Sequence, residues 1–278
     1  MARFALAAGG YAFTVAAMYA FVTAGFWTYP GGDAYVWDRV GDQLRAGISP
    51  YYSLPGFGAF YYAPPWAIAF ALVSWLPVQV VSVAILVAEV LSLRYVVGSW
   101  YRVGYVAWLP LVPLELIGSQ WNLVMAAAIA AAMRGEPRPA VLMAFAKLSP
   151  VLAIDPRHWR RVVPVAVALV AVTLVWPGLW LDWSRQLADA YGSNIAPGAQ
   201  LMVPFLPRLA VALGLLAIRR PWSRGLAAIV ALPTIYWVSF LLLLALIPPP
   251  RSGDPNPAVS ADEPTVITNP PLRKVTRE

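Results

Sequence analysis

The chain has 278 residues, of which 60% are hydrophobic and only 12% are charged. Soluble domains carry about 25% charged residues, so this composition indicates an integral membrane protein. The absence of cysteine excludes disulfides and thiol chemistry, and the single histidine, His158, excludes a multi-histidine metal site. The net charge of +7 comes from basic residues in short clusters between apolar runs, a pattern typical of membrane loops rather than of nucleic-acid binding.

Apolar runs follow one another along residues 1–247 and predict an all-α membrane protein, a polytopic helical bundle of about nine hydrophobic segments. The expected segments are residues 4–28, 65–76, 78–98, 105–117, 123–133, 139–154, 162–176, 201–218 and 226–247. Several are shorter than the roughly 20 residues of a full span, so we expect broken helices around a cavity. Residues 248–278 are rich in proline and polar residues and predict a disordered tail.

Charge in the loops predicts the orientation of the bundle. Arg3 on the short first flank favours a cytoplasmic N-terminus. The same rule places the basic loops 155–161 and 219–224 in the cytoplasm, and the loops 31–65 and 177–200 outside. We therefore expect a multi-pass protein of the plasma membrane whose functional surface faces outward.

The first outer loop contains a predicted amphipathic helix beside the membrane. Apolar residues recur there at helical spacing, and charged residues fill the other face: Val36, Trp37, Val40 and Leu44 against Asp38, Arg39, Asp42 and Arg45. Gly47 is placed to end this helix, and Pro50 prevents it from resuming.

Asp33 begins this helix just outside the first segment, and two interpretations of it stay open. Aspartate is a preferred residue at the N-terminal cap of a helix, which would make its role structural. A carboxylate at a membrane interface can instead act as a general base toward a hydroxyl.

Lys147 lies inside an apolar run, where ionisable residues are costly and are functional candidates by default. It suits a lipid phosphate, or else it snorkels to an interface or pairs with Glu115. Glu89 and Arg94 share one segment but lie five residues apart, so they do not stack on one face. We expect each of them to pair elsewhere in a structural role.

Other polar residues in or beside the apolar segments also have two interpretations each. Gln120 and Asn122 serve either as hydrogen-bonding contacts between helices or as the lining of a cavity. Arg185, Asn194 and Arg208 reach an anionic headgroup, or they anchor the chain at the interface.

Several motifs occur in an order typical of one enzyme family. The first motif is an aspartate followed by a tyrosine just after the first segment, here Asp33 and Tyr35. A Gly-x-x-Pro-Tyr element comes next, here Gly47, Pro50 and Tyr51. A Tyr-x-Pro-Pro element then opens the second segment, here Tyr62, Pro64 and Pro65. A glycine-glutamine-asparagine turn follows, here Gly118, Gln120 and Asn122, with Ser119 inserted. An Ala-x-Lys-x-x-Pro element and a later loop complete the set, here Ala146, Lys147, Pro150, Asn194 and Arg208. In this order, residues 1–210 resemble the family-87 glycosyltransferases of the GT-C superfamily.

The resemblance implies a GT-C-like bundle and an inverting transferase that moves a sugar, typically mannose, from a polyprenyl-phosphate donor. The acceptor is expected to be a lipid or glycan hydroxyl at the outer face of the membrane. The resemblance gives the role of catalytic base to Asp33, and we expect the leaving phosphate to meet Lys147, Arg185 and Arg208. The expected substrate cavity is lined by Tyr35, Tyr62, Gln120, Asn122 and Asn194.

No cofactor and no nucleic-acid partner are expected; the expected partners are the donor, the acceptor and membrane lipids. No metal site is legible, although a carboxylate site of Asp33 and Asp38 stays open. Two other classes also stay open: a small transporter or flippase, and a non-catalytic membrane assembly subunit. Uptake of a substrate without formation of a product would favour the transporter. A protein whose function is unchanged when Asp33 is lost would favour the assembly subunit.

Overall fold

Helices form almost all of the regular structure in the residues that the computed structural model describes, which are 1–24, 32–51, 59–190, 200–201 and 203–248. The first half contains α1 (Ala2–Thr23), α2 (Asp33–Arg45), α3 (Pro64–Val73), α4 (Val78–Val97), α5 (Trp100–Val106), α6 (Leu111–Gly118), α7 (Asn122–Met133) and α8 (Arg138–Ala144). The 3-10 helices η1 (Ser149–Ala153) and η2 (Pro156–His158) then lead to α9 (Trp159–Thr173), α10 (Gly178–Ala190), α11 (Phe205–Ala217), α12 (Pro221–Val230) and η3 (Trp237–Leu246). Strands β1 (Gln200–Leu201) and β2 (Ile235–Tyr236) pair antiparallel, with Gln200 opposite Tyr236. All of these elements belong to the unit Met1–Ile247.

The described helices include two that are long and apolar enough to cross a membrane, α1 and α4. Two bent pairs, α6 with α7 and η2–α9 with α10, turn by 105° and 101° at their breaks and would raise the number to four. The expectation of about nine hydrophobic segments is therefore wrong as a count of spans. The remaining apolar runs fold as short helices: α3 has 10 residues and so reaches only about 15 Å, half of a bilayer core.

The α4 helix separates an interior face from an outer face, although its sequence is apolar almost throughout. Ile85, Glu89 and Leu93 are at most 5% exposed and follow one another at four-residue spacing. On the opposite face, Val87 and Leu91 are at least half exposed. In a membrane protein this exposed face is the one that meets lipid, and the Glu89 face meets the bundle.

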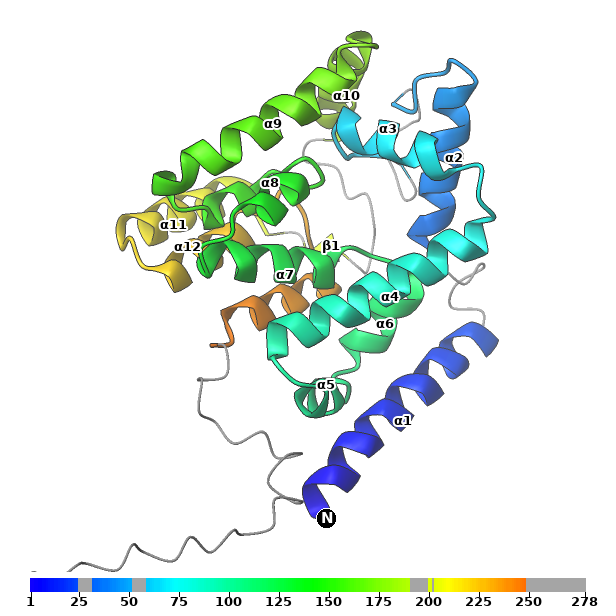
Figure 1. Cartoon of the computed structure of the whole chain (residues 1–278), viewed down its shortest axis with the longest axis vertical. Helices are drawn as coiled ribbons and strands as arrows, with labels where there is room; N and C mark the ends of the chain where they lie inside the picture. The colour runs from blue at the N-terminus through cyan, green and yellow to red at the C-terminus, as the bar shows by residue number, and fades with distance from the viewer. Residues whose placement is uncertain (25–31, 52–58, 191–199, 202, 249–278) are drawn as a thin grey trace, which may run out of the picture. The chain divides into compact units, whose positions relative to one another are not determined.

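The α7 helix forms the centre of the main core (Figure 1). It packs against α4, α8, α12 and η3. Most of its side chains are buried all round, and many are alanine, which allows neighbouring helices to approach closely. Its first residue, Asn122, is 1% exposed, so the polar start of this helix lies inside the protein.

The α2 helix confirms the amphipathic helix predicted for the first loop. Trp37, Val40 and Leu44 are buried in a second core, where the Trp37 ring stacks on Phe70 of α3 at a centroid distance of 5.1 Å. The helix ends as predicted, because Gly47 has a φ of +76°, a conformation that favours glycine.

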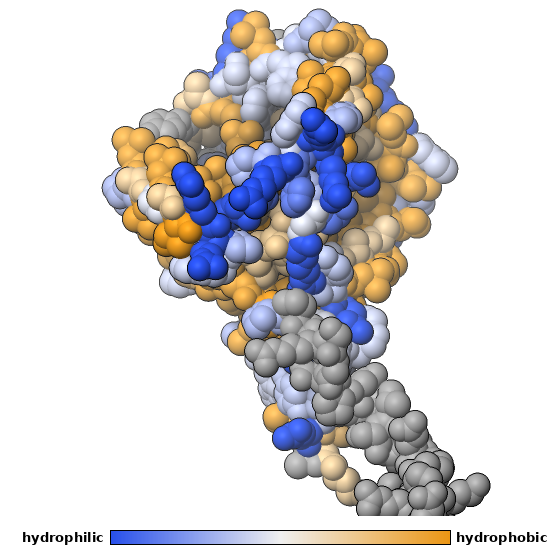
Figure 2. Space-filling view, turned by 60° about the vertical axis from the view of Figure 1, so that its left-hand side comes forward, coloured by the Kyte–Doolittle hydropathy of each residue, from blue (hydrophilic) through white to orange (hydrophobic). Residues whose placement is uncertain are grey.

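The two basic loops that were predicted to be cytoplasmic lie on the same side of the unit. Arg224 of α12 forms an ion pair with Asp155 at 2.9 Å, and Arg161 donates to the backbone carbonyl of Gly135. The backbone N–H of Arg157 and the charge of Arg224 lower the pKa of Asp155, which therefore stays ionised. Figure 2, turned so that the α11–α12 side comes forward, shows a band of hydrophilic side chains flanked by hydrophobic ones.

The α1 helix packs against α5 and α6 through small residues. Gly10 lies so close to Gly104 that a Cβ on Gly10 would overlap the Gly104 carbonyl oxygen. Three side chains stabilise this contact by donating hydrogen bonds to backbone carbonyl oxygens of the facing segment. Thr14 donates to Ala107 at 2.7 Å, Tyr11 to Trp100 at 2.6 Å and Trp108 to Leu6 at 2.9 Å.

We predict that Gly10→Ala destabilises the protein, because the added methyl group forces α1 away from α5. Gly214→Ala in α11 is the matched control, since a Cβ there meets nothing within 4 Å. Alanine is favoured over glycine in a helix by about 1 kcal/mol, so the control should be neutral or stabilising. Thermal unfolding in detergent measures both; equal melting temperatures for the two variants would contradict the close contact.

Candidate functional site

The bend between α6 and α7 is held by a buried carboxylate. Glu115 is 0% exposed, and its Oε1 accepts hydrogen bonds from the backbone N–H groups of Asn122 at 2.6 Å and of Leu123 at 3.2 Å. Its Oε2 accepts from the Asn122 side-chain amide at 2.9 Å. The first N–H groups of a helix have no partner within that helix, so this carboxylate caps α7 and fixes the Asn122 amide.

The same amide connects Lys147 and Gln120 to the bend. Lys147, in the connection between α8 and η1, donates a long hydrogen bond of 3.4 Å from Nζ to Oδ1 of Asn122. The Asn122 Nδ2 also donates to Oε1 of Gln120 at 3.2 Å. The Nζ of Lys147 lies 5.7 Å from the centroid of the Tyr236 ring. The structure thus brings Gln120, Asn122 and Lys147 together, and links Lys147 to Glu115 through Asn122.

Asp33 faces this cluster from the first turn of α2. The residue in the cap position is Gly32, so Asp33 is the first helical residue, where a negative charge is favourable. Part of its side chain is exposed, but close protein surroundings raise the pKa of Asp33 to about 7. The positive charge of Lys147 acts in the opposite direction and lowers it, which shows that the two groups lie within electrostatic range.

Aromatic rings wall this site on the side of α2 and α3. The Trp121 ring lies 5.3 Å from Trp37 and 5.2 Å from Trp66, measured between centroids. Tyr62 contacts the same two tryptophans, and the nearby Asp33 adds to the effect of burial in raising the pKa of the Tyr62 hydroxyl. Tyr62 therefore remains protonated and can donate a hydrogen bond at neutral pH.

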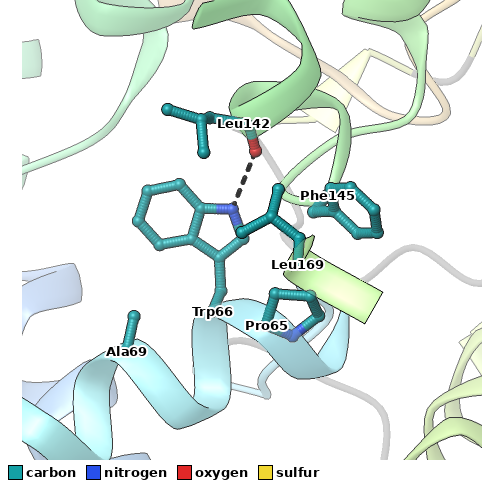
Figure 3. Close-up of a pocket in the computed structure, with 6 residues that line it drawn as sticks. All are labelled: Pro65, Trp66, Ala69, Leu142, Phe145 and Leu169. Atoms are coloured by element: carbon teal, nitrogen blue, oxygen red, sulfur yellow. Dashed lines mark hydrogen bonds between the residues drawn. The ribbon is translucent and has the colours of Figure 1, made fainter. Parts of the chain in front are cut away.

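Two apolar hollows adjoin these rings, and Trp66 lines both. The smaller, of about 100 Å³, lies between α3, α8 and α9, where the Trp66 indole donates to the Leu142 carbonyl at 3.2 Å (Figure 3). The larger, of about 540 Å³, runs beside α4, α7 and α8 and is lined mainly by apolar side chains, including Leu91 and Val124. The polar site therefore borders apolar surface that can accept hydrocarbon.

The predicted arginines form their described polar contacts with residues outside this cluster. The Arg208 guanidinium donates to backbone carbonyls of five residues: Val203, Pro204, Val230, Leu232 and Pro233. Its donors hold α11 to the segment after α12, so Arg208 has a structural position. Arg185 lies 3.9 Å from Asp182 on α10, and its side chain is 64% exposed.

The other predicted site residues have mixed outcomes. Tyr35 lies on α2 and is partly exposed, and Asn194 is outside the residues that the structure describes. Within the described part of the chain no group of three or more acidic or histidine side chains is placed to hold a metal. Asp33 and Asp38 gain no third acidic or histidine neighbour there.

Sequence reasoning missed three residues that the structure places at this site. In the sequence, Glu115 suggests only a direct partner for Lys147; the signal for its actual role is its place seven residues before Asn122, across a turn. Tyr236 comes from a segment with no motif. Glu89 was expected to pair, but among the described residues neither of its oxygens has a hydrogen-bond partner.

Comparison with protein-family models, curated proteins and solved structures finds no match to this chain.

We predict that Arg208→Lys destabilises the protein, because one ammonium cannot satisfy the carbonyls that the guanidinium now serves. A buried acceptor left without a donor costs about 1–3 kcal/mol. Arg185→Lys, on an exposed side chain, is the matched control and should melt like the parent. Detergent melting followed by tryptophan fluorescence measures both variants. If Arg208→Lys melts at the parent temperature, the structural role of this arginine is wrong.

Proposed function

We propose that this membrane protein is a glycosyltransferase that moves a sugar, typified by mannose, from a polyprenyl-phosphate donor to a lipid or glycan hydroxyl. We place the reaction at the outer face of the plasma membrane. The observation that carries this proposal is the proximity of Asp33 and Lys147: a carboxylate and an ammonium from distant segments lie within electrostatic range of each other in one partly exposed, aromatic-walled site. The order of motifs that resemble family-87 glycosyltransferases supports it, because Asp33, Gln120, Asn122 and Lys147 all belong to that order.

The reaction needs a base on one side of the anomeric carbon and a cation on the other. The Asp33 carboxylate takes the proton of the acceptor hydroxyl while the acceptor oxygen bonds to the anomeric carbon. The bond from that carbon to the phosphate oxygen breaks, and its electron pair stays on the phosphate. The ammonium of Lys147 stabilises this charge. Attack opposite the leaving phosphate inverts the anomeric configuration.

The surroundings of each group suit its role. A general base works best with a pKa near the working pH, and Asp33 has a pKa of about 7. Lys147 is the only lysine in residues 1–247, and Asn122 holds it toward the site. The apolar hollows beside Trp66 offer a surface for the hydrocarbon part of such a donor. The lipid carries its phosphate to the membrane, so a separate soluble domain is unnecessary for donor capture.

We predict that Asp33→Asn lowers the transfer rate by a factor of at least about 100, the lower end expected for loss of a general base. The amide keeps the size of the side chain but cannot take the proton. Asp38→Asn and Asp42→Asn on the same helix are the controls and should transfer at nearly the parent rate. The assay uses a synthetic polyprenyl-phosphate mannose with detergent melting in parallel. Equal transfer by all three variants would remove Asp33 from the mechanism.

The same residue predicts the pH profile. Because the folded-state pKa of Asp33 is raised to about 7, the parent rate should rise as pH increases from 6 to 8. Its ordinary value is 3.8, so the folded state holds the proton more tightly. Asp33 thus reduces stability as pH rises from about 4 to 7, and Asp33→Asn should abolish that loss. A parent rate that is flat across this range would contradict the assignment.

We predict that Lys147→Ala weakens donor use, seen as a raised KM for the polyprenyl-phosphate sugar, whereas Lys147→Arg keeps part of it. Lys274→Ala, which removes the other lysine of the chain, is the charge-matched control and should leave KM unchanged. Steady-state kinetics at varied donor concentration measures this. A folded Lys147→Ala protein with the parent KM and rate would exclude a phosphate-binding role.

A further inference from the structure

Two fully buried glutamates in the described core have opposite surroundings. Glu115 is 0% exposed and accepts three hydrogen bonds, from Asn122 and Leu123. Glu89 is also 0% exposed, but neither of its oxygens has a hydrogen-bond partner among the described residues. Glu115 therefore serves the structure of the bend, whereas no contact within the described protein explains Glu89.

A carboxyl group in this position carries a free-energy cost. A buried polar group without a partner destabilises the fold, and an unpaired buried ion destabilises it more. An apolar side chain of the same size would avoid this cost, and the other buried residues of α4 are all apolar: Ile85, Leu93, Val96 and Val97. Polar groups of this kind inside membrane helices are functional candidates by default. A carboxyl group here offers a ligand hydrogen-bonding oxygens, and in its protonated form it both donates and accepts.

The side chain of Glu89 lies on the face of α4 that meets the bundle. It follows Ile85 and precedes Leu93 on the buried stripe, opposite the exposed Val87 and Leu91. Glu89 also lies within electrostatic range of Asp33 and Glu115. It therefore lies in the bundle interior, on the side where Asp33 and Glu115 lie, and does not face lipid.

A second polar group without a partner lies in this site. The indole N–H of Trp121 is buried and has no acceptor among the described residues, although its ring is held by Trp37 and Trp66. Trp66, by contrast, donates its own N–H to Leu142. The carboxyl group of Glu89 and the indole N–H of Trp121 thus both lack a hydrogen-bond partner among the described residues, and Trp121 packs against two other tryptophan rings. A ligand with several hydroxyls can satisfy both groups and pack its carbon face on the rings.

We propose that Glu89 and the Trp121 indole N–H bind the hydroxyls of the transferred sugar, with Glu89 acting as a specificity-determining ligand rather than as the base. This inference rests on the proposed glycosyl transfer and names the part of the donor that each group contacts. Asp33 and Lys147 act at the anomeric carbon and the phosphate, and Glu89 with Trp121 holds the ring. Binding, rather than proton transfer, is the role given to Glu89.

The test compares two probes on the purified full-length protein: a short-chain polyprenyl-phosphate mannose and the same polyprenyl phosphate without sugar. The parent should bind the mannose-bearing lipid more tightly. Glu89→Leu removes the polar group at similar size and should lose this preference by about tenfold, with binding of the bare lipid unchanged. Glu89→Gln keeps a donor and an acceptor and should retain most of the preference. Quenching of tryptophan fluorescence measures each affinity.

Stability gives an independent measurement, because removing an unpaired buried polar group should stabilise the fold. Glu89→Leu should therefore melt at or above the parent temperature while it loses sugar preference. A folded Glu89→Leu protein that keeps the full preference overturns the proposal for Glu89 and leaves glycosyl transfer intact. A parent that binds both lipids equally also overturns it, and the parent's transfer assay then decides separately whether the chain is a glycosyltransferase.

Discussion

The Glu115 carboxylate is the interaction on which the site depends. It caps the start of α7 from the end of α6, so two short helices meet at 105° with the backbone N–H groups of Asn122 and Leu123 paired. The same contact fixes the Asn122 amide, which in turn faces Lys147. Replacing this carboxylate with an apolar group would leave several buried donors unpaired at once. The bend therefore requires a polar interior, and it provides the site with its scaffold.

Local pattern was sufficient to predict some elements and not others. The amphipathic helix α2 was predictable because its period and its ending glycine are properties of a short stretch. The number of membrane spans was not predictable, because the apolar content of a segment does not show where its helix is interrupted by a turn. Segment 139–154, for example, divides into α8 and η1, and segment 226–247 into α12, β2 and η3.

The candidate site was predictable only where residues carried their own signal. Lys147 stood out as a cation in an apolar run, and Gln120 and Asn122 stood out as amides at the start of an apolar helix. Arg208 stood out in the same way as a cation in an apolar run, but its guanidinium donates hydrogen bonds to five backbone carbonyls. These hydrogen bonds depend on how α11 packs against the segment after α12, which the sequence does not show. Glu89 resembled an ordinary pairing residue in sequence. Only the packed structure shows that its described neighbours offer no partner.

The glycine contact between α1 and α5 has a consequence for how the chain is made. The surfaces of Gly10 and Gly104 meet only after all of the intervening segments have left the ribosome. Until then α1 has to reside in the lipid as a solitary helix. Its sequence allows it to remain in the lipid without a partner, because no charged residue follows Arg3 within the helix. The order of synthesis thus requires α1 to be stable in the bilayer first and a packing partner second.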